Sequence, residues 1–156
     1  MLIFRLPDGN KMEIEASQTT AADIAKAISP RLLKAAICAK VDGQLVDLDR
    51  VLVQGGDFEV ITSKSEEALE VIRHSASHIM AQAIKRLYPE AKFAIGPATQ
   101  DGFYYDIDLP EKLGENDLKA IEAEMQKIVA EDLPFERREL PQKSALAYFA
   151  SRGDQY

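Results

Sequence analysis

Two Asp-Gly dipeptides in the first third of the chain constrain how it can fold. Asp8-Gly9 separates residues 2–6 (LIFRL) from 11–16 (KMEIEA), and Asp42-Gly43 separates 35–41 from 44–48. Asp-Gly between short runs of alternating apolar residues is a strong turn signal, because glycine tolerates the positive φ that tight turns require. The sequence therefore predicts strands on both sides of each turn.

A short helix and one more strand complete this first module. Thr19 or Thr20 can cap the helix, and Pro30 is expected to end it. Residues 58–61 (FEVI) form the last predicted strand. A hairpin, a helix and further strands over about 60 residues are typical of a ubiquitin-like β-grasp domain, which we assign to 1–63. Such a fold says nothing about chemistry.

The residues from 64 to 156 predict a second module of α+β class, with helices packed on a small antiparallel sheet. Helices are expected over 66–87, over 116–131, and from Pro141 to just before Gly153. Strands are expected over 93–95, 102–108 and 135–140. In the first helix the apolar positions follow spacings of three and four: Leu69, Ile72, Ala76, Ile79, Met80, Ala83, Ile84 and Leu87. In the second helix the residues expected to face inward are Leu118, Ile121, Met125, Ile128 and Val129.

Both histidines of the chain, His74 and His78, lie in the predicted helix 66–87, four residues apart. At ~100° per residue the apolar stripe centres near 40°, while the histidines fall at about 200° and 240°. They therefore share one face, nearly opposite the expected core. The neighbouring serines, Ser75 and Ser77, are expected to be polar residues of the helix surface.

Three interpretations of the histidine pair remain open from spacing alone. The two residues can be surface histidines without a function. They can be two ligands of a zinc ion, but no third ligand is apparent and the glutamate of the H-E-x-x-H motif is missing, so no metal is expected in these residues. They can also serve acid–base chemistry, because an imidazole titrates near neutrality.

The composition excludes several other classes of protein. The formal net charge is −7 with a pI near 4.9, which argues against generic electrostatic binding to nucleic acid, DNA included, or to anionic membranes. A local site that reads one specific RNA end is compatible with this charge. A single cysteine, Cys38, excludes an internal disulfide and fits a reducing cytoplasm. No apolar run approaches the ~20 residues of a membrane span.

The run IRHSASHIMAQAIKRLYP followed by FAIGPATQDGFYYDID resembles the editing domain of the threonyl-tRNA synthetase family. The stretches LPDG, VDGQLVDL and ITSKSEEALEVIRHS resemble the ubiquitin-like TGS domain that precedes it. The H-x-x-x-H motif alone is weakly specific, because alanyl-tRNA editing proteins also carry it. Combined with the GP…GFYYD segment and the domain before it, the resemblance is specific and covers essentially the whole chain.

The resemblance implies a class II enzyme that attaches threonine to tRNA(Thr) using ATP, Mg²⁺ and a bound Zn²⁺, and that acts as a homodimer. It also implies an editing site that hydrolyses seryl-tRNA(Thr). His74 and His78 match the histidine pair of that site, Tyr105 matches a pocket tyrosine, and Gly96 and Pro97 match its loop.

The family's editing site also uses a Cys-x-x-x-His segment and a lysine, and Tyr156 ends this sequence before either. We therefore expect a fragment that holds the TGS domain and an unfinished editing domain (64–156), contains no cofactor and is inactive alone. Two alternatives stay open. One is a β-grasp adaptor with a scaffold and no enzymatic activity. The other is a freestanding hydrolase of the alanyl-tRNA type that uses zinc.

Overall fold

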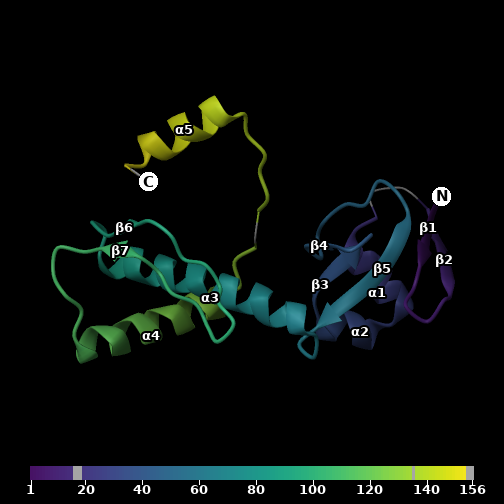
Figure 1. The fold of residues 1–156 in the computed structure, drawn as a ribbon, viewed down its shortest axis with the longest axis horizontal. Helices are drawn as coiled ribbons and strands as arrows, with labels where there is room; N and C mark the ends of the chain where they lie inside the picture. The colour runs from purple at the N-terminus through teal and green to yellow at the C-terminus, as the bar shows by residue number, and fades with distance from the viewer. Residues whose placement is uncertain (16–18, 135, 154–156) are drawn as a thin grey trace. The chain divides into compact units, whose positions relative to one another are not determined.

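The computed structural model describes residues 1–15, 19–134 and 136–153, and the chain forms two compact units (Figure 1). Unit 1 is Met1–Val71 and unit 2 is Ile72–Tyr156. Both contain helices and strands, which confirms the predicted α+β class. Among the residues that the structure describes, no helix is both long and apolar enough to cross a lipid bilayer.

Unit 1 is a five-stranded sheet with two short helices. The strands lie in the order β2-β1-β5-β3-β4. The first and last strands of the unit, β1 and β5, are parallel, and the other neighbours are antiparallel. This topology confirms the predicted β-grasp fold. The bounds of the elements are β1 Leu2–Arg5, β2 Lys11–Ile14, α1 Ala21–Ile28, α2 Pro30–Ala35, β3 Ala36–Val41, β4 Gln44–Val46 and β5 Gly56–Thr62. The end of the strand predicted over 11–16 lies partly outside the described residues.

The start of α1 follows the sequence expectation, and its end differs in one respect. Thr20 caps α1 with a reciprocal capping box, in which its side chain and that of Asp23 each accept from the other's backbone amide. The helix stops at Ile28, and Pro30 then opens a second helix that was not predicted. Proline suits the first position of a helix because its missing N–H has no helical partner there.

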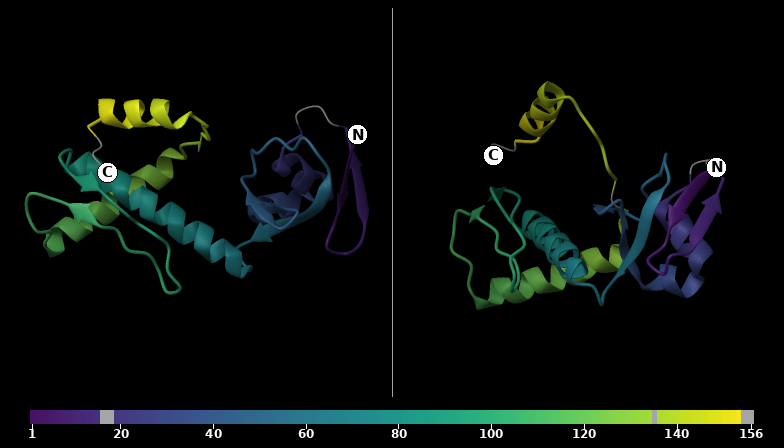
Figure 2. Two further views of the ribbon diagram at one scale, coloured as in Figure 1. Left: turned by 45° about the horizontal axis from the view of Figure 1, so that its top comes forward. Right: turned by 45° about the vertical axis from the view of Figure 1, so that its right-hand side comes forward.

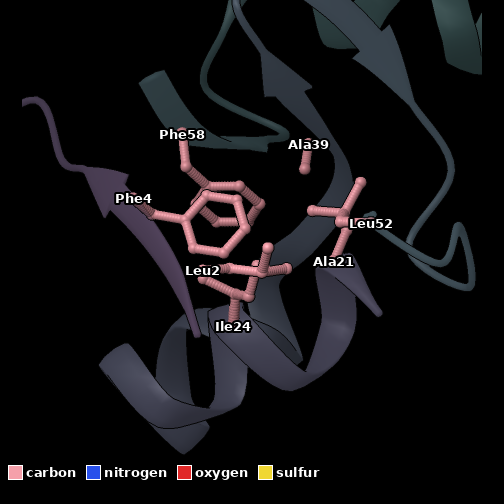
Figure 3. Packing of buried hydrophobic residues seen from close by; sticks show 7 residues of the cluster. All are labelled: Leu2, Phe4, Ala21, Ile24, Ala39, Leu52 and Phe58. Atoms are coloured by element: carbon pink, nitrogen blue, oxygen red, sulfur yellow. The ribbon is translucent and has the colours of Figure 1, made fainter. Parts of the chain in front are cut away.

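The core of unit 1 lies between α1 and the sheet (Figure 3). The rings of Phe4 and Phe58 meet edge to face with centroids 5.7 Å apart. Leu2 and Ile24 pack against them, so that β1, β5 and α1 share one apolar centre. Each of these side chains is at most 8% exposed.

The first turn and a half of α3, a helix of bounds Glu66–Leu87, belongs to unit 1. Ala68 is buried with Cys38 and Ile61 of the sheet. Lys40 of β3 also forms an ion pair with Glu67. The compact unit therefore extends past the domain boundary expected at residue 63.

Unit 2 contains the rest of α3, a two-stranded sheet and two more helices. The helices confirm the expected segments: α4 is Glu115–Glu131 and α5 is Gln142–Ser151. The strands are much shorter than predicted: β6 is Lys92–Phe93 and β7 is Ile107–Asp108. Residues 136–140 contain no strand, so the strand predicted over 135–140 is wrong for its described part.

The strands β6 and β7 are short because the segment that connects them is irregular. Beyond the two paired residues of each strand, the chain continues as an irregular hairpin with backbone hydrogen bonds from Ala94 to Asp106 and from Asp106 to Ile95. An isolated bridge joins Ala98 to Phe103. The segment predicted as a strand over 102–108 is therefore mostly loop, because its backbone follows a turn instead of a regular ladder.

The core of unit 2 forms where α4 packs on α3 and on the small sheet (Figure 2). Only part of each predicted apolar stripe enters it. Ala83 and Ile84 of α3 and Ile121 and Ile128 of α4 are buried. Several residues that the sequence predicted to face inward are more than a third exposed, because a helix with one main partner buries a narrow strip. These are Leu69, Ile72, Leu87, Leu118 and Val129.

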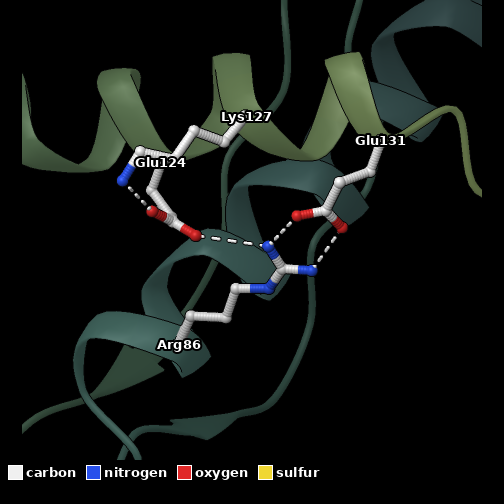
Figure 4. A network of polar contacts seen from close by, with 4 residues as sticks. All are labelled: Arg86, Glu124, Lys127 and Glu131. Carbon is white, nitrogen blue, oxygen red and sulfur yellow. Dashed lines mark hydrogen bonds and ion pairs between the residues drawn. The ribbon is translucent and has the colours of Figure 1, made fainter.

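An ion-pair network joins α3 to α4 beside this core (Figure 4). Arg86 donates to Glu131 through both of its terminal nitrogens, at 2.6 and 2.7 Å, and to Glu124 at 3.2 Å. Lys127 also contacts Glu124 at 2.9 Å. Hydrogen bonds from Arg86 hold the pKa of Glu131 below its usual value. The bidentate contact between Arg86 and Glu131 fixes how α4 is oriented on α3.

Candidate functional site

The two histidines of α3 contact each other directly. The Nε2 atoms of His74 and His78 lie 3.0 Å apart, and the ring centroids are 4.6 Å apart at an interplanar angle of 69°. Both side chains are exposed. At this distance one nitrogen donates and the other accepts, so the two Nε2 atoms share one proton.

The surroundings of His78 disfavour its charged form. Partial burial of the ring lowers the pKa of His78 below its usual value, and the adjacent His74 lowers it further. A neutral imidazole keeps one nitrogen free to accept a proton. The pair can therefore accept a proton from a bound water without first losing one to solvent.

Ser77, between the histidines in sequence, is fully buried, which contradicts the expectation of a surface serine. Its hydroxyl lies 2.7 Å from the carbonyl oxygen of His74 and 3.3 Å from that of Gly96. The side of α3 next to the histidines is therefore covered by the segment that begins at Gly96. Helical spacing could not predict this, since the covering segment is irregular and distant in sequence.

Tyr105 lies on Gly96 in the hairpin that follows α3. A Cβ atom added to Gly96 would lie 2.4 Å from two ring carbons of Tyr105, so the ring rests against the bare backbone. Phe93 meets the same ring edge to face, with centroids 5.6 Å apart. Tyr105 is half-buried while Tyr104 is 52% exposed, so the two tyrosines have different surroundings.

A cleft of about 740 Å³ brings His78 and Tyr105 together. Its floor includes Phe93, and three basic side chains also line it, namely Lys85, Lys92 and Arg152. The Nζ of Lys85 donates to the carbonyl of Ala91 at 2.8 Å. The volume falls within the range of about 300–1,000 Å³ that is usual for small-molecule sites.

The structure places the sequence-predicted site residues in different surroundings. His78 and Tyr105 line the cleft, and His74 contacts His78 without lining the cleft itself. The backbone of Gly96 lies against the ring of Tyr105. Pro97 is half-buried next to Gly96. Besides Ser77, the sequence analysis missed Arg73, whose guanidinium holds the hairpin loop.

The described residues do not form a site for the metal that the resemblance implies. No group of three or more His, Cys, Asp or Glu side chains is placed to hold an ion in the part of the chain that the structure describes. Two imidazoles supply only half of a tetrahedral zinc site. The absence of a metal stays a prediction.

Comparison with known proteins gives matches to the first module and to the whole chain. Residues 1–62 match the TGS domain family. The whole chain is 46% identical to a threonine–tRNA ligase of Carboxydothermus hydrogenoformans, of which it covers 24%. Over 97% of its length it is 51% identical to a threonine–tRNA ligase of Symbiobacterium thermophilum and 50% identical to one of Pelobacter propionicus, covering 23% and 24% of them. The chain thus spans about a quarter of the length of the curated relatives it matches. Along its full length the chain is similar to threonine–tRNA ligases, and its residues 1–62 are similar to TGS domains.

Proposed function

We propose that this chain is part of a threonyl-tRNA synthetase, a class II enzyme that uses ATP to join threonine to tRNA(Thr). Unit 2 then holds part of the site that hydrolyses seryl-tRNA(Thr) made in error. The observation that carries the proposal is the contact of His74 with His78, beside a cleft that Tyr105 also lines.

An editing site is needed because serine differs from threonine by one missing methyl group. A single methyl group gives only ~1–3 kcal/mol of discrimination in a binding pocket. A second site that admits the smaller product and hydrolyses it restores accuracy. The cleft of about 740 Å³ is large enough for a seryl ester.

The proposed reaction is the hydrolysis of an ester. A water oxygen forms a bond to the ester carbonyl carbon, and the bond from that carbon to the ribose oxygen breaks. The water gives up a proton to the histidine pair, and the departing ribose oxygen takes up a proton, leaving free serine and tRNA. The lowered pKa of His78 keeps it able to accept that proton at neutral pH.

No step of this proposal passes through ATP, Mg²⁺ or Zn²⁺. The described residues fit none of the metal sites that the intact enzyme implies. The partner of the intact enzyme is tRNA(Thr), and we propose a homodimer in the cytoplasm. The 156 residues alone are expected to show neither aminoacylation nor measurable deacylation, because a histidine pair and a tyrosine beside one cleft are an incomplete site.

The test is the pair of substitutions His74→Ala and His78→Ala in a full-length synthetase that carries this region. Deacylation of seryl-tRNA(Thr) should fall by about 10²–10⁴-fold, the usual loss when acid–base assistance is removed. Threonine charging should stay near the parent rate. Both side chains are exposed, so no core cavity opens and the melting temperature should hardly change.

Glu122→Ala is the matched control, since Glu122 is an exposed residue of α4 in the same unit. It should leave both rates unchanged. If the double histidine variant clears seryl-tRNA at the parent rate, the editing proposal fails and the adaptor alternative gains support.

A further inference from the structure

The loop between β6 and β7 is held by side chains of α3. The Nη1 of Arg73 donates to the backbone carbonyls of Thr99, at 3.2 Å, and Gln100, at 2.5 Å. One helical turn later, the Ser77 hydroxyl lies 3.3 Å from the carbonyl of Gly96. We call Arg73 and Ser77, with these three carbonyls, the loop clamp. Its two side chains are four residues apart and therefore share one face of the helix.

The Ser77 hydroxyl is the buried half of the loop clamp. It has one proton and two acceptors in reach, the carbonyls of His74 and Gly96. The carbonyl of His74 can also accept from the amide four residues later in the helix, so it does not depend on Ser77. Among the hydrogen bonds of the described residues, the carbonyl of Gly96 has no other donor. The contact to His74 is the shorter one, so Ser77 holds the Gly96 carbonyl through the longer and weaker of its two contacts.

The position of Gly96 in turn fixes the position of Tyr105. The Tyr105 ring lies against Gly96 so closely that no Cβ fits between them. Phe93 packs edge to face on the same ring. If the Gly96 carbonyl moved away from α3, the Tyr105 ring could move with it. The side of the cleft that faces His78 would then change shape.

We propose that Arg73 and Ser77 are positioning residues that hold Gly96 and, through it, Tyr105 at the His78 cleft. One part of this inference rests on the proposed function, namely that the clamp makes the deacylation step faster. The clamp itself is a structural claim that can be tested without activity.

The structural test uses the 156-residue chain labelled with 3-fluorotyrosine. The chain has five tyrosines and no tryptophan, so the ¹⁹F spectrum is simple, and Tyr105→Phe identifies the Tyr105 signal. Ser77→Ala should move or broaden that signal. Ser75→Ala is the matched control on the same helix, since no side-chain hydrogen bond of Ser75 occurs among the described residues, and it should leave the signal in place. Arg73→Met perturbs the loop from its other end and should also move the signal.

The functional test uses the full-length synthetase. Ser77→Ala should lower kcat for seryl-tRNA deacylation about tenfold with little change in KM, because the loss is one of geometry at the reacting groups. A Tyr105 signal at the parent position in both Ser77→Ala and Arg73→Met overturns the clamp. Unchanged deacylation in Ser77→Ala, where His78→Ala abolishes it, overturns the positioning role. If His78→Ala has no effect either, the proposed function fails, and the fluorine spectrum alone decides the clamp.

Discussion

Replacing Gly96 by alanine should disturb the candidate site from a position that carries no reactive group. The added Cβ would lie 2.4 Å from two carbons of the Tyr105 ring and 2.8 Å from a third. Ordinary van der Waals contact at such a Cβ begins at 3.4 Å, so the ring has to move by about 1 Å. Phe93 packs on the same ring and resists that movement.

The size of the effect follows from overpacking. Forcing an extra methyl group into a packed contact costs about 1–3 kcal/mol. In a unit of this size, each kcal/mol lowers the melting temperature by about 4–8 °C. In the full-length synthetase, a displacement of about 1 Å at the cleft should reduce seryl-tRNA deacylation by up to about 100-fold. The measurements are thermal unfolding followed by circular dichroism and the single-turnover rate of deacylation.

Gly102→Ala provides the matched control from the same loop. Nothing lies within 4 Å of a Cβ added there, and the backbone of Gly102 is not in the left-handed region. Its unfolding free energy should stay within about 0.5 kcal/mol of the parent. In a Tyr105→Ala background, Gly96→Ala should hardly lower the free energy of unfolding, because the ring that causes the clash is gone. Equal costs in both backgrounds would show that the Gly96–Tyr105 contact is not as described.

Two further predictions concern pH and metal. Because the folded-state pKa of His78 is lowered, the unfolded chain binds more protons than the folded chain in the pH range around the two pKa values. The stability that this group contributes is therefore complete above the unfolded pKa, about 6.5, and is lost as the pH falls through the folded pKa. Urea unfolding between about pH 8 and pH 5 should therefore show a steeper loss in the parent than in His78→Gln, and equal slopes would contradict the assignment. Protein purified without a metal-affinity step should contain no stoichiometric zinc, because two imidazoles leave a tetrahedral ion half-coordinated; one zinc per chain that disappears in His78→Ala would revive the metal alternative.

The sequence predicted the long elements of the fold well because their signals are local. The helix expected over 66–87 is α3 with the same bounds, since its start, its spacing of apolar residues and its Tyr88-Pro89 end all agree. The helix after Thr20 is capped as the side chains suggested. Those features depend on hydrogen bonds within a few residues of one another, which sequence patterns record directly.

The sequence failed where the environment of a residue is set by a distant segment. Leu118 and Val129 follow helical spacing, yet they are 59% and 62% exposed because α4 has only a narrow contact with its partners. The strand expected over 102–108 shortens to Ile107–Asp108 because the residues before it pair with 94–98 through scattered hydrogen bonds and an isolated bridge. Periodicity cannot indicate which face of an element another segment will cover.

Ser77 shows how packing and hydrogen bonding place separate demands on one position. The side chain is fully buried beside a backbone carbonyl, so anything larger than serine would have to push the Gly96 segment away from α3. Packing alone would accept alanine there, and alanine is the better helix former. What serine adds is one donor for a carbonyl that otherwise lacks one among the described residues. Ser77→Ala therefore removes the hydrogen bond while leaving the helix and the space between the segments nearly unchanged, and its effect on Tyr105 separates the two demands.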